Sequence, residues 1–143
     1  MEARSSGYQR WLKTALLAGV LYLVVGVTSG TLAGRAASDP MRTFWRWSAF
    51  VLSAVVLAAH VADEHFRLRH SARPSAWHAS VAAAVGGFGL AMAANMHELG
   101  SASGYRPRML LALAVWPLLT AVPAFVVALV LAAGLGRMRE ASR

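Results

Sequence analysis

The amino-acid sequence predicts an all-α membrane protein, an up-down bundle of four transmembrane helices with short loops. Hydrophobic residues make up 57% of the 143 residues and charged residues only 14%, whereas about a quarter of a soluble domain is usually charged. The charges are gathered between long apolar stretches, and four stretches reach the roughly 20 residues that a helix needs to cross a bilayer. We therefore expect a single transmembrane domain over residues 1–143, with lipid covering most of its surface.

The first two predicted helices are separated by a clear break. The first covers about residues 11–34 and follows a basic start, and its apolar run is longer than the roughly 7–15 residues of a signal-peptide core. We therefore interpret it as a true membrane helix. The pair Asp39-Pro40 is expected to interrupt the chain, because the residue before a proline avoids the helical conformation. The second helix then covers about residues 44–62.

The third and fourth predicted helices differ in composition. The third covers about residues 76–96 and is rich in alanine. The fourth covers about residues 109–136, after a break at residues 100–107, and it carries Pro117 and Pro123. Each proline removes a backbone hydrogen bond, so we expect bends or a tilt that fit this long apolar run into the bilayer.

Lysine and arginine are unevenly distributed between the two sides that four crossings create. The side with both termini and the second connection carries nine of them, and the opposite side carries five. The positive-inside rule therefore predicts an integral protein of the plasma (inner) membrane with both termini in the cytoplasm. Because the connections are short, we expect consecutive helices to be antiparallel neighbours.

The net charge of +8 does not indicate a nucleic-acid partner. Most basic residues lie at the ends of apolar segments, where they meet lipid headgroups, and they do not form a separate patch. We expect membrane lipids as partners and no nucleic acid. The absence of cysteine excludes disulfides, thiolate metal sites and cysteine nucleophiles. With no catalytic pattern and no loop large enough for a soluble domain, we do not expect an enzyme.

Two columns of small residues predict close helix packing. Small residues recur at every fourth position near the end of the first helix and through the third. The members are Gly26, Gly30 and Gly34 in the first helix and Ala83, Gly87 and Ala91 in the third. Such a column lets a neighbouring backbone approach closely. The neighbour is either a helix of the same chain or another membrane protein, and both alternatives stay open.

A thin polar face runs along the second helix. Arg46, Ser53 and His60 recur at seven-residue intervals, and Asp63 and Glu64 follow near its end. Ionisable groups within a span usually face the protein interior or a water-filled cavity, so we expect this face to look inward or to line a narrow path. The alternative is that Arg46 extends to the interface and Ser53 bonds a carbonyl of its own helix.

The strongest candidate for a ligand site lies at the cytoplasmic end of this face. His60 and Glu64 are one helical turn apart, and His78 begins the third helix on the same side. Imidazole and carboxylate groups bind metals such as zinc, so the three predict a metal site, and the two histidines are a candidate pair for haem. The alternative is an interfacial ion-pair cluster in which Asp63 pairs with Arg67 at i,i+4.

Three functional hypotheses follow from these features. The leading one is a small multi-pass membrane protein that acts by assembly, as a homo-oligomer or as an accessory subunit of a larger membrane complex. The second is an ion or small-molecule channel or transporter lined by the polar face of the second helix. The third is a membrane-embedded metal- or haem-binding protein at the histidine and glutamate cluster, and no other cofactor is indicated by the sequence.

Overall fold

The computed structural model describes residues 2–67, 71–100 and 108–141. Within these ranges the chain forms four α-helices and no strand, which confirms the predicted all-α class. Each helix contains a segment that is long and apolar enough to cross a membrane. The helices are α1 (Glu2–Arg35), α2 (Asp39–Phe66), α3 (Ala72–Leu99) and α4 (Arg108–Ala141).

All four helices extend beyond the apolar segments that predicted them, because helical hydrogen bonding continues past the edge of the apolar region. The expected break at Asp39-Pro40 is displaced: both residues lie in the first turn of α2. Proline is well tolerated there, since the first helical N–H groups have no partner within the helix. Ser38 precedes them, and its hydroxyl oxygen accepts from the Met41 N–H at 3.5 Å. Of the predicted break before α4, residues 101–107 lie outside the described ranges.

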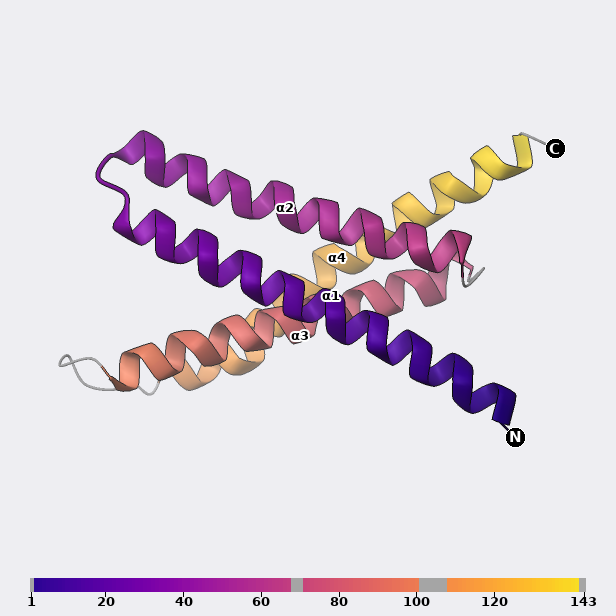
Figure 1. Ribbon diagram of the computed structural model, residues 1–143, viewed down its shortest axis with the longest axis horizontal. Coiled ribbons are helices and arrows are strands. Elements are labelled where there is room, and N and C mark those ends of the chain that lie inside the picture. The colour runs from indigo at the N-terminus through magenta and orange to yellow at the C-terminus, as the bar shows by residue number, and fades with distance from the viewer. Residues whose placement is uncertain (1, 68–70, 101–107, 142–143) are drawn as a thin grey trace.

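The four helices form two antiparallel hairpins that cross one another (Figure 1). The α1–α2 hairpin lies across the α3–α4 hairpin, and the start of α1, the end of α2, the start of α3 and the end of α4 lie at the same end of the molecule. The contact between α3 and α4 is the most extensive, and α1 contacts both α2 and α3. Among the described residues, no Cα atom of α1 lies within 8 Å of a Cα atom of α4. The packing is therefore less even than that of a regular up-down bundle.

The two hairpins cross at a point where α1 and α3 each have a glycine facing the other helix. A Cβ atom placed on Gly86 would lie 2.5 Å from the Cβ of Tyr22 and 3.1 Å from the carbonyl oxygen of Gly19. A Cβ placed on Gly19 would in turn lie 2.8 Å from the side chain of Val85. Only glycine permits this approach of two backbones, which is the usual role of small residues in membrane helices.

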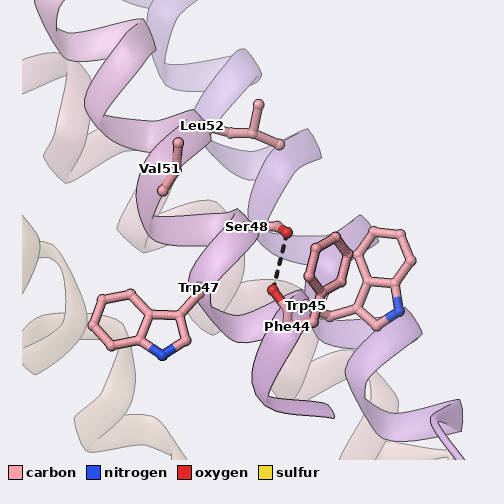
Figure 2. A pocket seen from close by; sticks show the side chains of 6 residues that line it. All are labelled: Phe44, Trp45, Trp47, Ser48, Val51 and Leu52. Atoms are coloured by element: carbon pink, nitrogen blue, oxygen red, sulfur yellow. Dashed lines mark hydrogen bonds between the residues drawn. The ribbon is translucent and has the colours of Figure 1, made fainter. Parts of the chain in front are cut away.

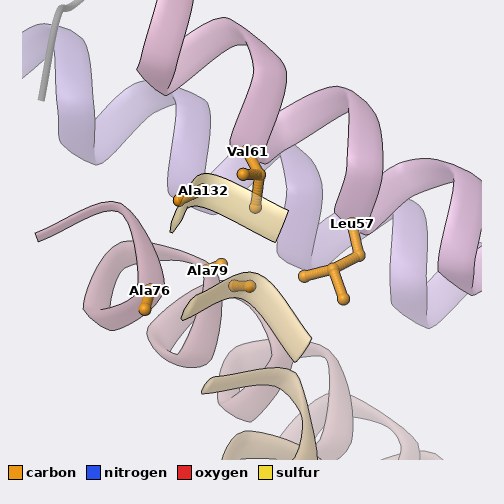
Figure 3. Close-up of a cluster of buried hydrophobic side chains, with 6 residues drawn as sticks. Leu57, Val61, Ala76, Ala79 and Ala132 are labelled. Carbon is orange, nitrogen blue, oxygen red and sulfur yellow. The ribbon is translucent and has the colours of Figure 1, made fainter. Parts of the chain in front are cut away.

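A small apolar core joins the hairpins next to this crossing (Figure 3). The larger side chains come from α2, and they point toward alanines of α3 and α4. Small side chains on α3 and α4 keep this core thin and let three helices meet closely. The buried members are Leu57 and Val61 of α2, Ala76 and Ala79 of α3, and Ala128 and Ala132 of α4.

The small-residue column of α3 packs against α4. Ala83 and Ala91 are buried, and a Cβ on Gly87 would meet the side chain of Thr120. The Thr120 hydroxyl lies 3.1 Å from the carbonyl oxygen of Ala83, and it also lies within hydrogen-bonding distance of carbonyls in its own helix. Near the far end, the Asn95 side-chain amide donates to the Met109 carbonyl at 2.9 Å. For this column, the neighbour that the sequence left open is a helix of the same chain.

Candidate functional site

The polar face predicted along α2 is divided by the structure into three environments. Arg46 is exposed, and Ser53 is half-buried beside a cavity between the hairpins. His60 and Glu64 are buried at the end of α2 that lies near the termini. Buried Leu57 lies between Ser53 and His60, so the face does not form one continuous polar strip.

Glu64 and His78 form a buried pair between α2 and α3. The Glu64 side chain has no exposed surface, and its two carboxylate oxygens each lie 3.0 Å from Nδ1 of His78. An Nδ1–H group in this position donates between both oxygens. Burying a carboxylate is costly unless a hydrogen-bonded or charged partner accompanies it, and His78 is such a partner. The predicted approach of α2 and the start of α3 is therefore realised through these two side chains.

Trp11 brings α1 to the same pair. Its indole ring lies on the imidazole of His78, with 4.4 Å between the ring centroids and an angle of 41° between the planes. Three helices thus meet at one point: α1 through Trp11, α2 through Glu64 and α3 through His78. Trp11 lies at the start of the first apolar segment, and this position in the sequence indicates only an interfacial anchor. The signal that could have linked it to His78 is the position of both residues at the same end of their apolar segments.

Several polar atoms near the pair have no hydrogen-bond partner among the described residues. His60 is only 4% exposed, and neither of its ring nitrogens is bonded. The Ser75 hydroxyl and Nε2 of His65 are also buried without a hydrogen-bond partner among the described residues. A buried polar atom without a partner costs about 1–3 kcal/mol. This end of the bundle therefore contains buried donors and acceptors that could still form hydrogen bonds, in addition to the Glu64–His78 pair.

The three residues predicted to bind a metal are not arranged around one point. In the part of the chain that the structure describes, no three His, Cys, Asp or Glu side chains are close enough to share a metal ion. Glu64 and His78 instead bond to each other. The alternative prediction of an Asp63–Arg67 ion pair is confirmed, with 3.3 Å between Asp63 Oδ1 and Arg67 Nε. The carboxylate–imidazole pair is thus the chemistry that the structure assembles here.

The glycine column of α1 is divided between two environments. A Cβ on Gly26 would lie 2.6 Å from the side chain of Leu90 in α3, so this glycine packs inside the molecule. Around Gly30 and Gly34 no described atom lies within 4 Å of the Cβ position. The column that the sequence presents as one feature therefore serves internal packing at one end only.

The first turns of α2 carry an aromatic group on the outer surface (Figure 2). Phe44, Trp45 and Trp47 project from this single helix, and Trp47 is 66% exposed. The Ser48 hydroxyl donates to the Phe44 carbonyl at 2.9 Å, so it offers no free donor. Exposed aromatic rings at the end of a span are typical of membrane interfaces. These aromatic side chains line a shallow hollow on the surface of α2. We assign this hollow to lipid contact.

No protein-family model, curated protein or solved structure matches this chain in the three comparisons made. The function must therefore be inferred from the arrangement of its own residues. Two features are left unexplained by internal packing: the open glycine surface of α1 and the cavity between the hairpins.

Proposed function

We propose that this protein acts by assembly in the membrane, as a homo-oligomer or as an accessory subunit of a larger complex. The observation that carries the proposal is the open surface around Gly30 and Gly34 of α1, where no described atom lies within 4 Å of either Cβ position. We call these two residues and their exposed neighbours Val27 and Thr31 the α1 glycine surface.

Exposed glycines in a lipid environment favour the close approach of a second helix. Glycine lowers helix propensity and contributes little contact area to lipid tails. It becomes favourable when a second helix packs closely against it, because backbone approach increases van der Waals contact. On the inner side of the same turns, Ser29 and Ala33 are buried within the molecule. The α1 glycine surface is therefore free to receive another transmembrane helix.

We also propose an orientation for this assembly. The start of α1, the end of α2, the start of α3 and the end of α4 lie at one end of the molecule. Nine of the 14 lysine and arginine residues belong to these helix ends or to the segments that adjoin them in the sequence. The positive-inside rule supports placing it in the cytoplasm, with the protein in the plasma (inner) membrane.

The alternative of conduction along the polar face of α2 has less support. The cavity beside Ser53 is lined by Leu57 at one end, and neither His60 nor Glu64 contributes to its wall. A path through the protein would need these groups to share one polar passage. Assembly through the outer surface of α1 therefore has the stronger support.

The experiment is the mass of the purified protein in mild detergent, with Gly30→Leu and Gly34→Leu as test variants. We expect the wild type to exceed the 15.2 kDa of one chain, through further copies or a second membrane protein. Each leucine variant should elute at the mass of one chain and keep its helical circular dichroism, because leucine prevents close helix approach.

Gly134→Leu is the matched control, since Gly134 of α4 also has no described atom within 4 Å of its Cβ position. It should retain the wild-type mass. A wild type with the mass of a single chain would contradict the proposal. So would a Gly30→Leu variant of unchanged mass, or an equal loss in the control.

A further inference from the structure

A cavity of about 480 Å³ lies between the two crossed hairpins, with walls from all four helices. This volume is within the range of roughly 300–1,000 Å³ that is typical of small-molecule sites. The wall is predominantly apolar. Tyr22 of α1, Phe50 of α2 and Trp116 of α4 supply aromatic rings, while Gly86 and Gly87 of α3 supply a surface without side chains.

The cavity opens sideways, between α2 and α4. Phe50 and Leu119 line it from these two helices and are 71% and 60% exposed. Contact between α2 and α4 is much less extensive than contact between α3 and α4. In a membrane this opening faces the hydrocarbon core, because it lies near the middle of both helices. A ligand would therefore enter from the bilayer and not from the aqueous phase.

Ser53 places a free hydrogen-bonding group in this apolar wall. Its hydroxyl makes no hydrogen bond to any residue in the described ranges, whereas the hydroxyls of Ser48, Ser80 and Thr120 each bond a backbone carbonyl. The predicted alternative, in which Ser53 bonds a carbonyl of its own helix, is therefore not realised. A hydroxyl without a partner is unfavourable in hydrocarbon surroundings.

The opposite wall lacks a helical hydrogen bond. Pro123 lines the cavity and has no N–H, so it cannot donate to the carbonyl of Leu119, which also lines it. The wall thus offers the Ser53 hydroxyl on α2 as a donor. On α4 it contains the Leu119 carbonyl, which receives no helical hydrogen bond from Pro123. A second hydroxyl, that of Tyr22 on α1, is also buried without a hydrogen-bond partner among the described residues. The remaining wall is predominantly apolar.

We infer that this cavity binds a lipophilic molecule that enters from the bilayer and carries a carbonyl group accepting a hydrogen bond from Ser53. The apolar body of such a molecule would contact the aromatic and glycine walls, and its carbonyl would satisfy the hydroxyl. An ordinary acyl chain would fill the same volume but leave Ser53 without a partner. None of the residues in this argument belongs to the α1 glycine surface, so the inference stands apart from assembly.

The test uses benzophenone, an apolar ketone that crosslinks to nearby C–H bonds under ultraviolet light, with protein in liposomes. Labelling should map by mass spectrometry to the cavity-lining parts of α2 and α4. Dicyclohexyl ketone and dicyclohexylmethane serve as competitors that differ only in the carbonyl. We expect the ketone to compete about two- to twelvefold better, the factor given by one neutral hydrogen bond.

Three variants separate this site from general lipid contact. Ser53→Ala should keep the labelling but abolish the difference between the competitors. Ala54→Phe should remove the labelling, because Ala54 is an exposed residue of the cavity wall. Ala59→Phe is the matched control, since Ala59 is exposed on α2 but does not line the cavity. Equal competition by both compounds in the wild type would overturn the inference and indicate a cavity filled by acyl chains. Labelling unaffected by Ala54→Phe would also overturn it.

Discussion

Glu64 and His78 show how single residues can define a helix junction inside a membrane protein. A buried carboxylate–imidazole pair contributes little net stability, because removing both polar groups from water offsets their attraction. Removing only one partner is costly, since the other stays buried without a counterpart. Trp11 packs on the same imidazole, so one side chain of α3 contacts both α1 and α2. The pair therefore specifies which ends of the helices meet.

At this scale we predict that His78→Leu lowers the free energy of unfolding by about 3–5 kcal/mol, because it removes the imidazole that hydrogen bonds the fully buried Glu64 carboxylate. The double variant Glu64→Leu, His78→Leu should recover much of this loss. Unfolding in detergent, followed by circular dichroism, measures both. Asp63→Asn is the control: its partner Arg67 is 83% exposed, and surface pairs contribute about 0–1 kcal/mol. A double variant as unstable as the sum of its single variants would contradict this view.

At the scale of the helix, adjacent glycines of α3 face different neighbours. Gly86 meets Tyr22 and Gly19 of α1, whereas Gly87 meets Thr120 of α4. Successive residues point about 100° apart on a helix, so one glycine pair can serve two interfaces. This places α3 between α1 and α4 at the crossing and explains why it is the most buried span.

We predict that Gly86→Ala destabilises the protein by about 1–3 kcal/mol, the usual cost of overpacking. The added Cβ would lie 2.5 Å from the Cβ of Tyr22, an atom close to the backbone that cannot move independently of α1. Gly134→Ala should be neutral or slightly stabilising, since its position is open and alanine is the better helix former. Thermal unfolding of the two variants in one detergent makes the comparison. Equal stability of the two would mean that the hairpin crossing adapts freely.

At the scale of the whole molecule, the crossing of two hairpins produces both unexplained surfaces. The contact between α1 and α3 includes the close approach of Gly19 and Gly86, and the hairpins diverge away from the crossing. Toward one end, Gly30 and Gly34 are left uncovered. Between α2 and α4 the same divergence leaves the lateral cavity. An evenly packed bundle would have closed both.

The proposed orientation predicts a labelling pattern in intact cells. The chain has no cysteine, so single cysteines at Ala37 and Ser71 can report the two sides of the membrane. Both positions are exposed, and the Ser71 side chain makes no capping bond. Ala37→Cys should react with a membrane-impermeant maleimide directly, and Ser71→Cys only after permeabilisation. The reverse pattern would contradict cytoplasmic termini, and equal reactivity of both would contradict the crossing of the membrane between them.

The sequence by itself determined the all-α class, the number of helices that are long and apolar enough to span a membrane, and their approximate positions. These properties depend on the length and hydropathy of each segment, which are local. It also indicated the approach of Glu64 to His78, because a short connection joins two adjacent spans on one side. The Ala83–Gly87–Ala91 column was identified as a packing surface for a similar reason, since its spacing defines one face of a helix.

Only the tertiary structure decided which neighbour each face meets. Gly26 packs against α3 whereas Gly30 is open. Trp11 packs on His78, and four segments that are distant in the sequence together line one cavity. The physical reason is that the rotation and crossing of each helix result from packing over the whole molecule. A rotation of one residue, about 100°, exchanges a buried face for an exposed one without any change in hydropathy or spacing.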